Sequence, residues 1–308
     1  MRITRREFGK ALGGLGVGGM LAFEGCGRRQ EANSTSETAA DKPGSGRPGR
    51  RRLLGKTKLA LSTVGFGAQH TRDVELVRYA LDHGMNLIET SWLYGMGGRR
   101  SSCQCIGQAI AGRRDSVCLA VAYEAAFKPS SKAWVASQFE QTLRDLGTDH
   151  IDIFLWHHPG GGSINNSPLT LQQSQQLVAA GPGVDLMRKW KQEGKLRWCG
   201  ITTHSEQPEW LEFIAGSGLY EVAVVAFNYK SPKGIAQAMQ QAAGKGIGLI
   251  AMKTQSPHYA EKAVLGDAPD HAKALAWVLS KDYITAAIPG MTTRDHVDLN
   301  LKTMGSIL

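Results

Sequence analysis

The feature that most constrains the fold is a regular alternation, after residue 53, of short apolar runs with amphipathic stretches. The runs are nearly continuous in Val, Ile, Leu and Ala, which is typical of parallel strands buried on both faces. Between them, apolar residues such as Val74, Val77 and Leu81 recur at helical spacing. Alternating strands and helices predict an α/β protein with a parallel sheet. The eight predicted strands are residues 63–67, 86–90, 117–123, 151–157, 196–203, 222–228, 247–253 and 285–290.

Eight strands with crossover helices predict a closed (β/α)8 barrel, also called a TIM barrel, as one domain at residues 53–308. Such a barrel takes roughly 250 residues, which is about what remains after the N-terminal segment. An open doubly wound sheet is the alternative, but no Gly-x-Gly-x-x-Gly follows the first strand. The long stretch 159–182, rich in Gly, Ser and Gln, is predicted as a loop. Helices are predicted at residues 73–84, 134–146, 185–193 and 235–243.

The N-terminal segment 1–27 has the layout of a secretory signal, and a basic polar linker, residues 28–52, follows it. Adjacent Arg5 and Arg6 precede a short, mildly apolar stretch, and the segment resembles a twin-arginine export signal. The resemblance implies transport by the twin-arginine machinery to the periplasm or cell envelope, with this segment disordered or cleaved. The apolar stretch is too short to leave a transmembrane helix in the mature protein. A disordered tail with a chance arginine pair is the alternative, and Cys26 raises the question of lipid attachment.

The formal net charge of +9 is concentrated ahead of residue 53. In the folded part no basic stripe interleaved with aromatic residues follows, so the sequence does not predict nucleic-acid binding. Cys103 and Cys105 lie two apart on a predicted helix and therefore point to different sides. No His or Cys partner lies nearby in the sequence, so no metal site is predicted.

Several segments, in order along the chain, are similar to the aldo-keto reductases. Residues 86–95 read Asn-Leu-Ile-Glu-Thr-Ser-Trp-Leu-Tyr-Gly and resemble that family's second strand and loop. Residues 146–159 resemble its fourth strand with its His, and residues 193–201 its fifth. Residues 226–229 and 248–253 fit its sixth and seventh strands, and Ile-Pro-Gly-Met at 288–291 resembles its C-terminal signature.

The resemblance implies hydride transfer between a nicotinamide cofactor and a small-molecule carbonyl or alcohol. Tyr94 matches the residue that donates a proton to the developing oxyanion, and His157 matches the residue that orients the carbonyl. A slip of one residue would put His158 in the place of His157. Glu89 stands at the position of the family's Asp, and Ala122 stands where its Lys belongs.

Of the four catalytic residues of the family, this chain keeps the Tyr and the His and replaces the Asp by Glu89 and the Lys by Ala122. A cation beside a phenol lowers the pKa of that phenol, so Tyr94 loses this help, and an ionised Glu89 would oppose it further. Arg99, Arg100 or Lys128, in loops beside the same strand ends, are candidate substitutes.

On the cofactor side, the resemblance implies NADP, or else NAD. Thr202 and Thr203 match residues that bind the carboxamide, while Val224 stands where the family has a Gln. Arg294 is a candidate for a 2′-phosphate. The other residues that match cofactor-binding positions are Asn228, Gly290, Met291, Thr292 and Asn300.

Two further functions stay open at the level of sequence. The absent Lys is compatible with a non-catalytic barrel that binds a nucleotide or a partner. A different enzyme could also reuse the pocket, with Glu89 as a general base.

Overall fold

The computed structural model describes residues 51–95, 101–123, 132–157, 169–255, 258–259, 263–264 and 270–306. These residues belong to one compact unit, residues 45–308. The predicted signal at 1–27, Cys26 and all but the last two residues of the predicted linker lie outside the described residues. None of the helices in the described part has the length and apolarity that crossing a bilayer requires.

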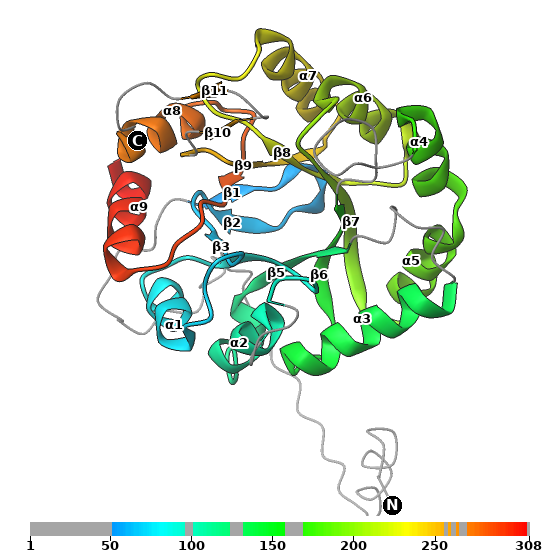
Figure 1. Ribbon diagram of the computed structural model, residues 1–308, viewed down its shortest axis with the longest axis horizontal. Coiled ribbons are helices and arrows are strands. Elements are labelled where there is room, and N and C mark those ends of the chain that lie inside the picture. Colours follow the sequence, from blue (N-terminus) through cyan, green and yellow to red (C-terminus); the bar gives the residue numbers. More distant parts are fainter. Residues whose placement is uncertain are drawn as a thin grey trace, which may run out of the picture. The chain divides into compact units, whose positions relative to one another are not determined.

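Eight parallel strands form the predicted barrel, with helices around the outside (Figure 1). The sheet runs in the order β12-β9-β8-β7-β6-β5-β4-β3, and isolated bridges from Val64 to Ala287 and from Gly67 to Gly290 close it. Because the two edge strands meet, the open-sheet alternative is wrong. The strands are β3 (Phe66–Gly67), β4 (Leu87–Ser91), β5 (Cys118–Tyr123), β6 (Ile151–His157), β7 (Leu196–Thr203), β8 (Val222–Ala226), β9 (Gly248–Met252) and β12 (Ala286–Ala287).

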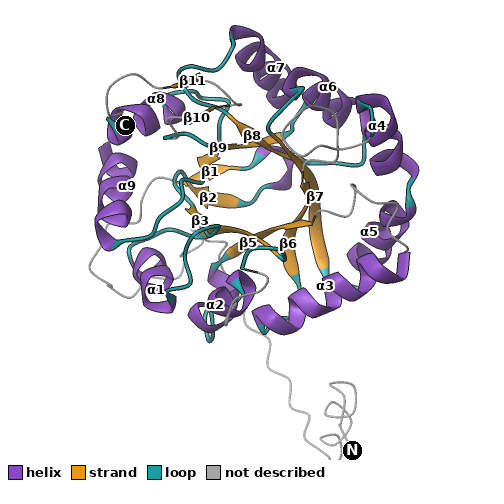
Figure 2. Ribbon diagram, in the orientation of Figure 1, coloured by secondary structure: helices purple, strands orange, loops and turns teal. Residues whose placement is uncertain are grey.

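The helices cover the outer face of the barrel (Figure 2). Four of them have a side-chain cap at the first turn: Asp73 accepts from two backbone N–H groups, Ser101 and Thr170 form capping boxes, and Asp270 accepts from Lys273 N. The helices are α1 (Val74–Asp82), α2 (Ser102–Ala109), α3 (Lys132–Leu146), α4 (Leu171–Ala180), α5 (Pro182–Gln192), α6 (Gln207–Ser217), α7 (Lys233–Gly244), α8 (His271–Leu279) and α9 (Arg294–Ser306).

The prediction of one long loop at residues 159–182 is wrong in its second half, because α4 occupies Leu171–Ala180 and α5 begins at Pro182. The Gln-rich α4 buries only Ser174 and Val178, so its sequence carries a weak apolar period. The capping box of Thr170 and Gln173 was the signal that could have located it.

A hairpin precedes the first barrel strand. It pairs β1 (Arg51–Leu53) with β2 (Ala60–Ser62) around the short 3-10 helix η1 (Gly55–Thr57). The folded part thus begins at Arg51 among the described residues, two positions before the predicted boundary. The backbone N–H of Lys56 donates to Gly246 O at 2.9 Å, just ahead of β9, so the hairpin covers the amino-terminal ends of the strands. The carboxyl-terminal ends, where barrel enzymes carry their active sites, are left for function.

Side chains alternate between two apolar layers. On β5, Ala120 and Ala122 point into the barrel and pack near Leu155, while Tyr123 points out and stacks on Phe154 at 4.5 Å between ring centroids. This alternation is the period of two that every strand imposes. It fixes which residues of each strand can reach the barrel interior. Smaller elements complete the described part, namely η2 (Arg114–Ser116) and the paired β10 (His258–Tyr259) and β11 (Ala263–Val264).

Candidate active site

Glu89 projects into the barrel interior near the carboxyl-terminal end of β4. It lies two residues after Leu87, which belongs to the interior layer, and only 8% of it is exposed. Its partners in the sheet are Gly67 on β3 and Ala120 on β5, so neither neighbouring strand offers it a polar side chain. Burial raises the pKa of Glu89 from 4.5 to about 7. A carboxyl group whose pKa lies near neutral pH, at the active-site end of a barrel, is a candidate for proton transfer.

Tyr94 reaches back to this carboxyl group from the turn after β4. The backbone N–H of Tyr94 donates to Ser91 O at 3.1 Å, and its carbonyl accepts from Ser102 N at 2.9 Å where α2 begins. These bonds fix the turn, and the Tyr94 side chain forms a hydrogen bond with Glu89 that opposes the rise in the pKa of Glu89. Tyr94 and Glu89, which match the Tyr and the Asp of the family, are therefore in contact.

Two histidines lie at the ends of β6 and β7. His157 pairs with Thr202 across these strands, and His204 follows two residues later. Burial, together with the charges of Lys253 and His157, lowers the pKa of His204 from 6.5 to about 3. His204 is therefore neutral at neutral pH and can accept as well as donate a hydrogen bond. His204 was not among the predicted site residues, although it stands directly after the predicted Thr202-Thr203 pair.

Lys253 is the second residue that sequence reasoning missed. It follows β9 in the left-handed backbone conformation, with a φ of 57°. The interior layer contains Ile250 and Met252, so a regular strand would send residue 253 outward; the left-handed turn breaks that alternation. The charge of Lys253 acts on Glu89 and on His204, which lowers the pKa of each. A lysine at the carboxyl-terminal end of a predicted barrel strand was the available signal.

Asn228 supports that turn. Its Nδ2 donates to Lys253 O at 3.2 Å, and its Oδ1 accepts from Lys230 N at 2.9 Å. The side chain predicted to bind cofactor is fully buried and serves the backbone around it.

The threonines predicted to hold a carboxamide lie at the end of β7, and each is 2% exposed. Thr203 Oγ1 donates to Ser205 O, whereas Thr202 Oγ1 is buried without a hydrogen-bond partner. Thr254 Oγ1, just after Lys253, is likewise unpartnered, as is Trp92 Nε1 after β4. Buried polar atoms without partners are rare. These three lie at or just after the carboxyl-terminal ends of β7, β9 and β4, and this end of the barrel is therefore suited to a polar ligand.

The residues predicted for the far part of a dinucleotide run from the end of β12 into α9. Gly290, Thr292 and Arg294 are exposed, and Gly290 bridges to Gly67, the strand partner of Glu89. Met291 is fully buried, and Asn300 is 2% exposed with its Oδ1 accepting from Gln255 Nε2 at 2.8 Å.

Ala122 is fully buried on the interior face of β5, where it pairs with Ser91 and Leu155. The substitute cations Arg99, Arg100 and Lys128 lie outside the described residues, as does His158. Across the described ranges, no three His, Cys, Asp or Glu side chains gather where they could hold a metal ion.

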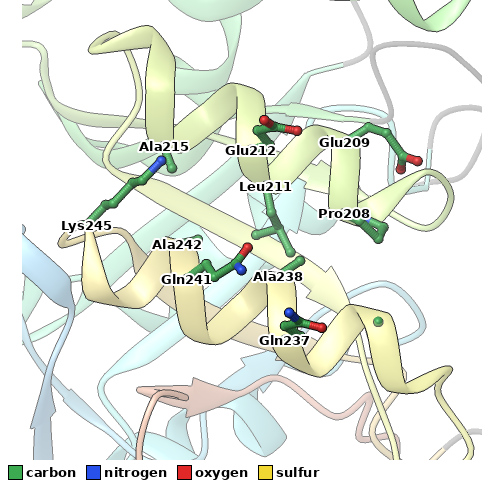
Figure 3. A pocket seen from close by; sticks show the side chains of 11 residues that line it. Pro208, Glu209, Leu211, Glu212, Ala215, Gln237, Ala238, Gln241, Ala242 and Lys245 are labelled. Atoms are coloured by element: carbon green, nitrogen blue, oxygen red, sulfur yellow. The ribbon is translucent and has the colours of Figure 1, made fainter.

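A groove of about 370 Å³ lies elsewhere, between α6 and α7 (Figure 3). Its walls include Glu209 and Glu212 from α6 and Gln237 and Gln241 from α7, and none of the strand-end residues lines it. It is separate from the candidate active site.

The sequence profile of the aldo/keto reductase family matches residues 59–273. The chain is 24% identical over 296 residues to the uncharacterized oxidoreductase YqkF of Bacillus subtilis, a match that covers 82% of this chain and 90% of that protein.

Two solved structures share the fold. The holo form of the aldo-keto reductase AKR11C1 from Bacillus halodurans has a TM-score of 0.65 at 22% identity, and the match covers 84% of this chain and 91% of that chain. The aldo/keto reductase of Klebsiella pneumoniae in complex with NADP and acetate has a TM-score of 0.62 at 23% identity, with coverage of 84% and 91%.

Proposed function

The chain belongs to the aldo/keto reductase family, and from that premise we propose that it is an oxidoreductase that reduces a small-molecule carbonyl with NADPH or oxidises the matching alcohol with NADP. The observation that carries the proposal is the hydrogen bond between Tyr94 and the buried Glu89 inside the barrel mouth. A barrel that only binds a nucleotide has no need for a buried carboxyl group bonded to a phenol, because burying that group costs stability.

Each residue of the mouth has a task in this chemistry. Tyr94 donates the proton that the developing oxyanion requires, and His157 hydrogen-bonds the carbonyl oxygen and orients it. His204 stays neutral and adds no positive charge beside His157 at working pH. Ala122 leaves the site without the Lys that assists the tyrosine in the family, so its proton donation depends on other groups.

The cofactor supplies the hydride when bound, and the chain offers polar atoms for it. Thr202 Oγ1 is buried and unpartnered and fits the carboxamide of a nicotinamide. Thr203 lies beside it, and the family resemblance assigns Gly290, Met291, Thr292, Arg294 and Asn300 to the adenosine end. Asn228 acts on that site through the Lys253 turn. The Klebsiella relative was solved with NADP, and the exposed Arg294 offers a cation for a 2′-phosphate.

The test is the absorbance of NADPH during incubation of the purified protein with a panel of aldehydes and ketones. We expect consumption that depends on carbonyl, falls at least about 10²-fold in Tyr94→Phe, and shows a raised KM for NADPH in Thr202→Val. Binding of NADP without turnover of any carbonyl or alcohol would favour the non-catalytic barrel. No binding of NADP or NAD would contradict the proposal and leave Glu89 as a base for other chemistry.

We also propose that residues 1–27 direct export by the twin-arginine pathway, which carries folded proteins and would allow cofactor to be loaded before transport. The support is the Arg5-Arg6 pair ahead of the apolar stretch. A reporter fused to residues 1–52 should reach the periplasm, and replacing both arginines by Lys should retain it in the cytoplasm. Export that survives this replacement would rule out the pathway.

A further inference from the structure

We propose that Glu89 is the proton source behind Tyr94: the carboxyl group passes its proton to the phenol as the phenol protonates the substrate, and this relay takes over the task of the Lys that position 122 lacks. The inference rests on the proposed carbonyl reduction. Its structural basis is the contact of the Tyr94 side chain with the Glu89 carboxyl group, close enough to act on the pKa of that carboxyl, and the placement of Glu89 on the interior face of β4 near its carboxyl-terminal end.

The substrate carbon gains a hydride with its electron pair from the dihydronicotinamide, and the carbonyl oxygen becomes an oxyanion. That oxygen takes the phenolic proton of Tyr94, and the phenol oxygen takes the carboxyl proton of Glu89. Glu89 ends as a carboxylate and is protonated again from water. In alcohol oxidation every transfer runs backwards, so the carboxylate of Glu89 is then the base.

The same hydrogen bond has two states with opposite consequences. When Glu89 is ionised, its carboxylate accepts the phenolic hydrogen of Tyr94, and that hydrogen is withheld from the substrate. When Glu89 is protonated, the carboxyl group donates to the phenol oxygen, and the phenolic hydrogen is directed to the substrate. Because burial raises the pKa of Glu89 to about 7, both states are populated near neutral pH.

The groups around Glu89 account for this balance. Gly67 and Ala120, on the adjacent strands, carry no charge. On α2, Cys103 is affected by the charge of Glu89 and is a neutral thiol, since burial raises the pKa of that thiol to about 12. Tyr94 and Lys253 are left to oppose the rise in the pKa of Glu89. Lys253 can do so because its left-handed turn, held by Asn228, departs from the outward direction of the strand.

Three proteins test the relay: wild type, Glu89→Gln and Lys253→Met. For wild type, we expect kcat for reduction to fall about tenfold per pH unit above the pKa of Glu89, near pH 7, and kcat for oxidation to rise with pH below that pKa and to level off above it. Glu89→Gln keeps the size of the side chain but cannot lose a proton. This variant should abolish the change of slope near pH 7 in the pH profile of kcat, and it should lower kcat for reduction at pH 6 by about 10²-fold. Lys253→Met should move this change of slope to higher pH, because it removes a positive charge that lowers the pKa of Glu89.

Two further readouts separate the relay from a structural role for Glu89. The infrared carbonyl band of a protonated carboxyl should disappear through about pH 7 in the cofactor-free wild type, and this titration should be absent in Glu89→Gln. In mixtures of light and heavy water, kcat for reduction should show two transferred protons in wild type and one in Glu89→Gln.

The outcomes are distinct. Absence of turnover by wild type on any carbonyl would overturn the proposed function and the relay together. The relay alone would be overturned if Glu89→Gln kept the change of slope in the pH profile of kcat, or if its kcat matched that of wild type at pH 6. Unchanged NADP affinity and circular dichroism in Glu89→Gln would show that the loss is chemical.

Discussion

At the level of single residues, Gly200 on β7 shows how closely the strands of the barrel approach one another. A Cβ atom at this position would lie 2.5 Å from Val222 O and 2.8 Å from Leu155 Cδ2. Val222 O is a backbone atom, so it cannot move without shifting its strand. Gly200→Ala should therefore lower the free energy of unfolding by about 1–3 kcal/mol, as overpacking does.

Urea unfolding of purified protein measures this change, and the chain supplies its own control. Gly216, exposed in α6, has nothing within 4 Å of a built Cβ. Gly216→Ala should raise the free energy of unfolding by about 0.5 kcal/mol, because Ala loses less conformational entropy in a helix. Equal effects at the two sites would contradict the packing argument.

At the scale of single elements, α1 depends on its cap. Asp73 accepts hydrogen bonds from Glu75 N at 2.9 Å and Leu76 N at 3.1 Å. Asp73→Ala should lower the free energy of unfolding by about 1 kcal/mol, whereas Asp73→Ser retains a capping oxygen and should cost much less. Thermal unfolding of the two variants compares them directly. A Ser variant as unstable as the Ala variant would mean that the cap contributes little.

The elements also show what a sequence can and cannot predict. Strands β6 and β7 begin and end where their apolar runs do, because both faces of these strands are buried. Predicted runs of five and six residues shrink to two-residue strands at β3 and β12, where only bridges close the barrel. Closure geometry of this kind is a property of the assembled sheet and leaves no local signal.

The candidate site follows the same division. Glu89 and Tyr94 lie five residues apart, so one segment of sequence was enough to predict both. His204 and Lys253 were missed because they influence the site from β7 and β9. Their effect depends on the closed barrel and, for Lys253, on a left-handed turn that strand periodicity does not predict.

For the whole molecule, two titratable groups with shifted pKa values oppose each other in the pH dependence of stability. Glu89 has a pKa raised from 4.5 to about 7, so the native state binds more protons in that window and stability falls as pH rises through it, by about 3 kcal/mol in total. His204 has a pKa lowered from 6.5 to about 3, so the unfolded state binds more protons and stability rises with pH over that range.

The two slopes have opposite signs where the windows overlap, between pH 4.5 and 6.5. Wild type should therefore be nearly flat there. Glu89→Gln should gain stability steadily as pH rises, and His204→Gln should lose it. Free energies of unfolding at half-unit pH steps check this. If Glu89→Gln follows the wild-type curve, the carboxyl group titrates alike in the native and unfolded states.

The seam at which β3 meets β12 has a consequence for synthesis. Its bridges join Val64 and Gly67, near the start of the described fold, to Ala287 and Gly290, near its end. A nascent chain on the ribosome cannot complete the ring until that last segment emerges. Until then the free edges of β3 and β9 offer unpaired backbone to any neighbouring chain. The nascent chain is therefore most prone to aggregation in the interval before its release from the ribosome, and a chaperone that binds nascent chains would act on those two edges.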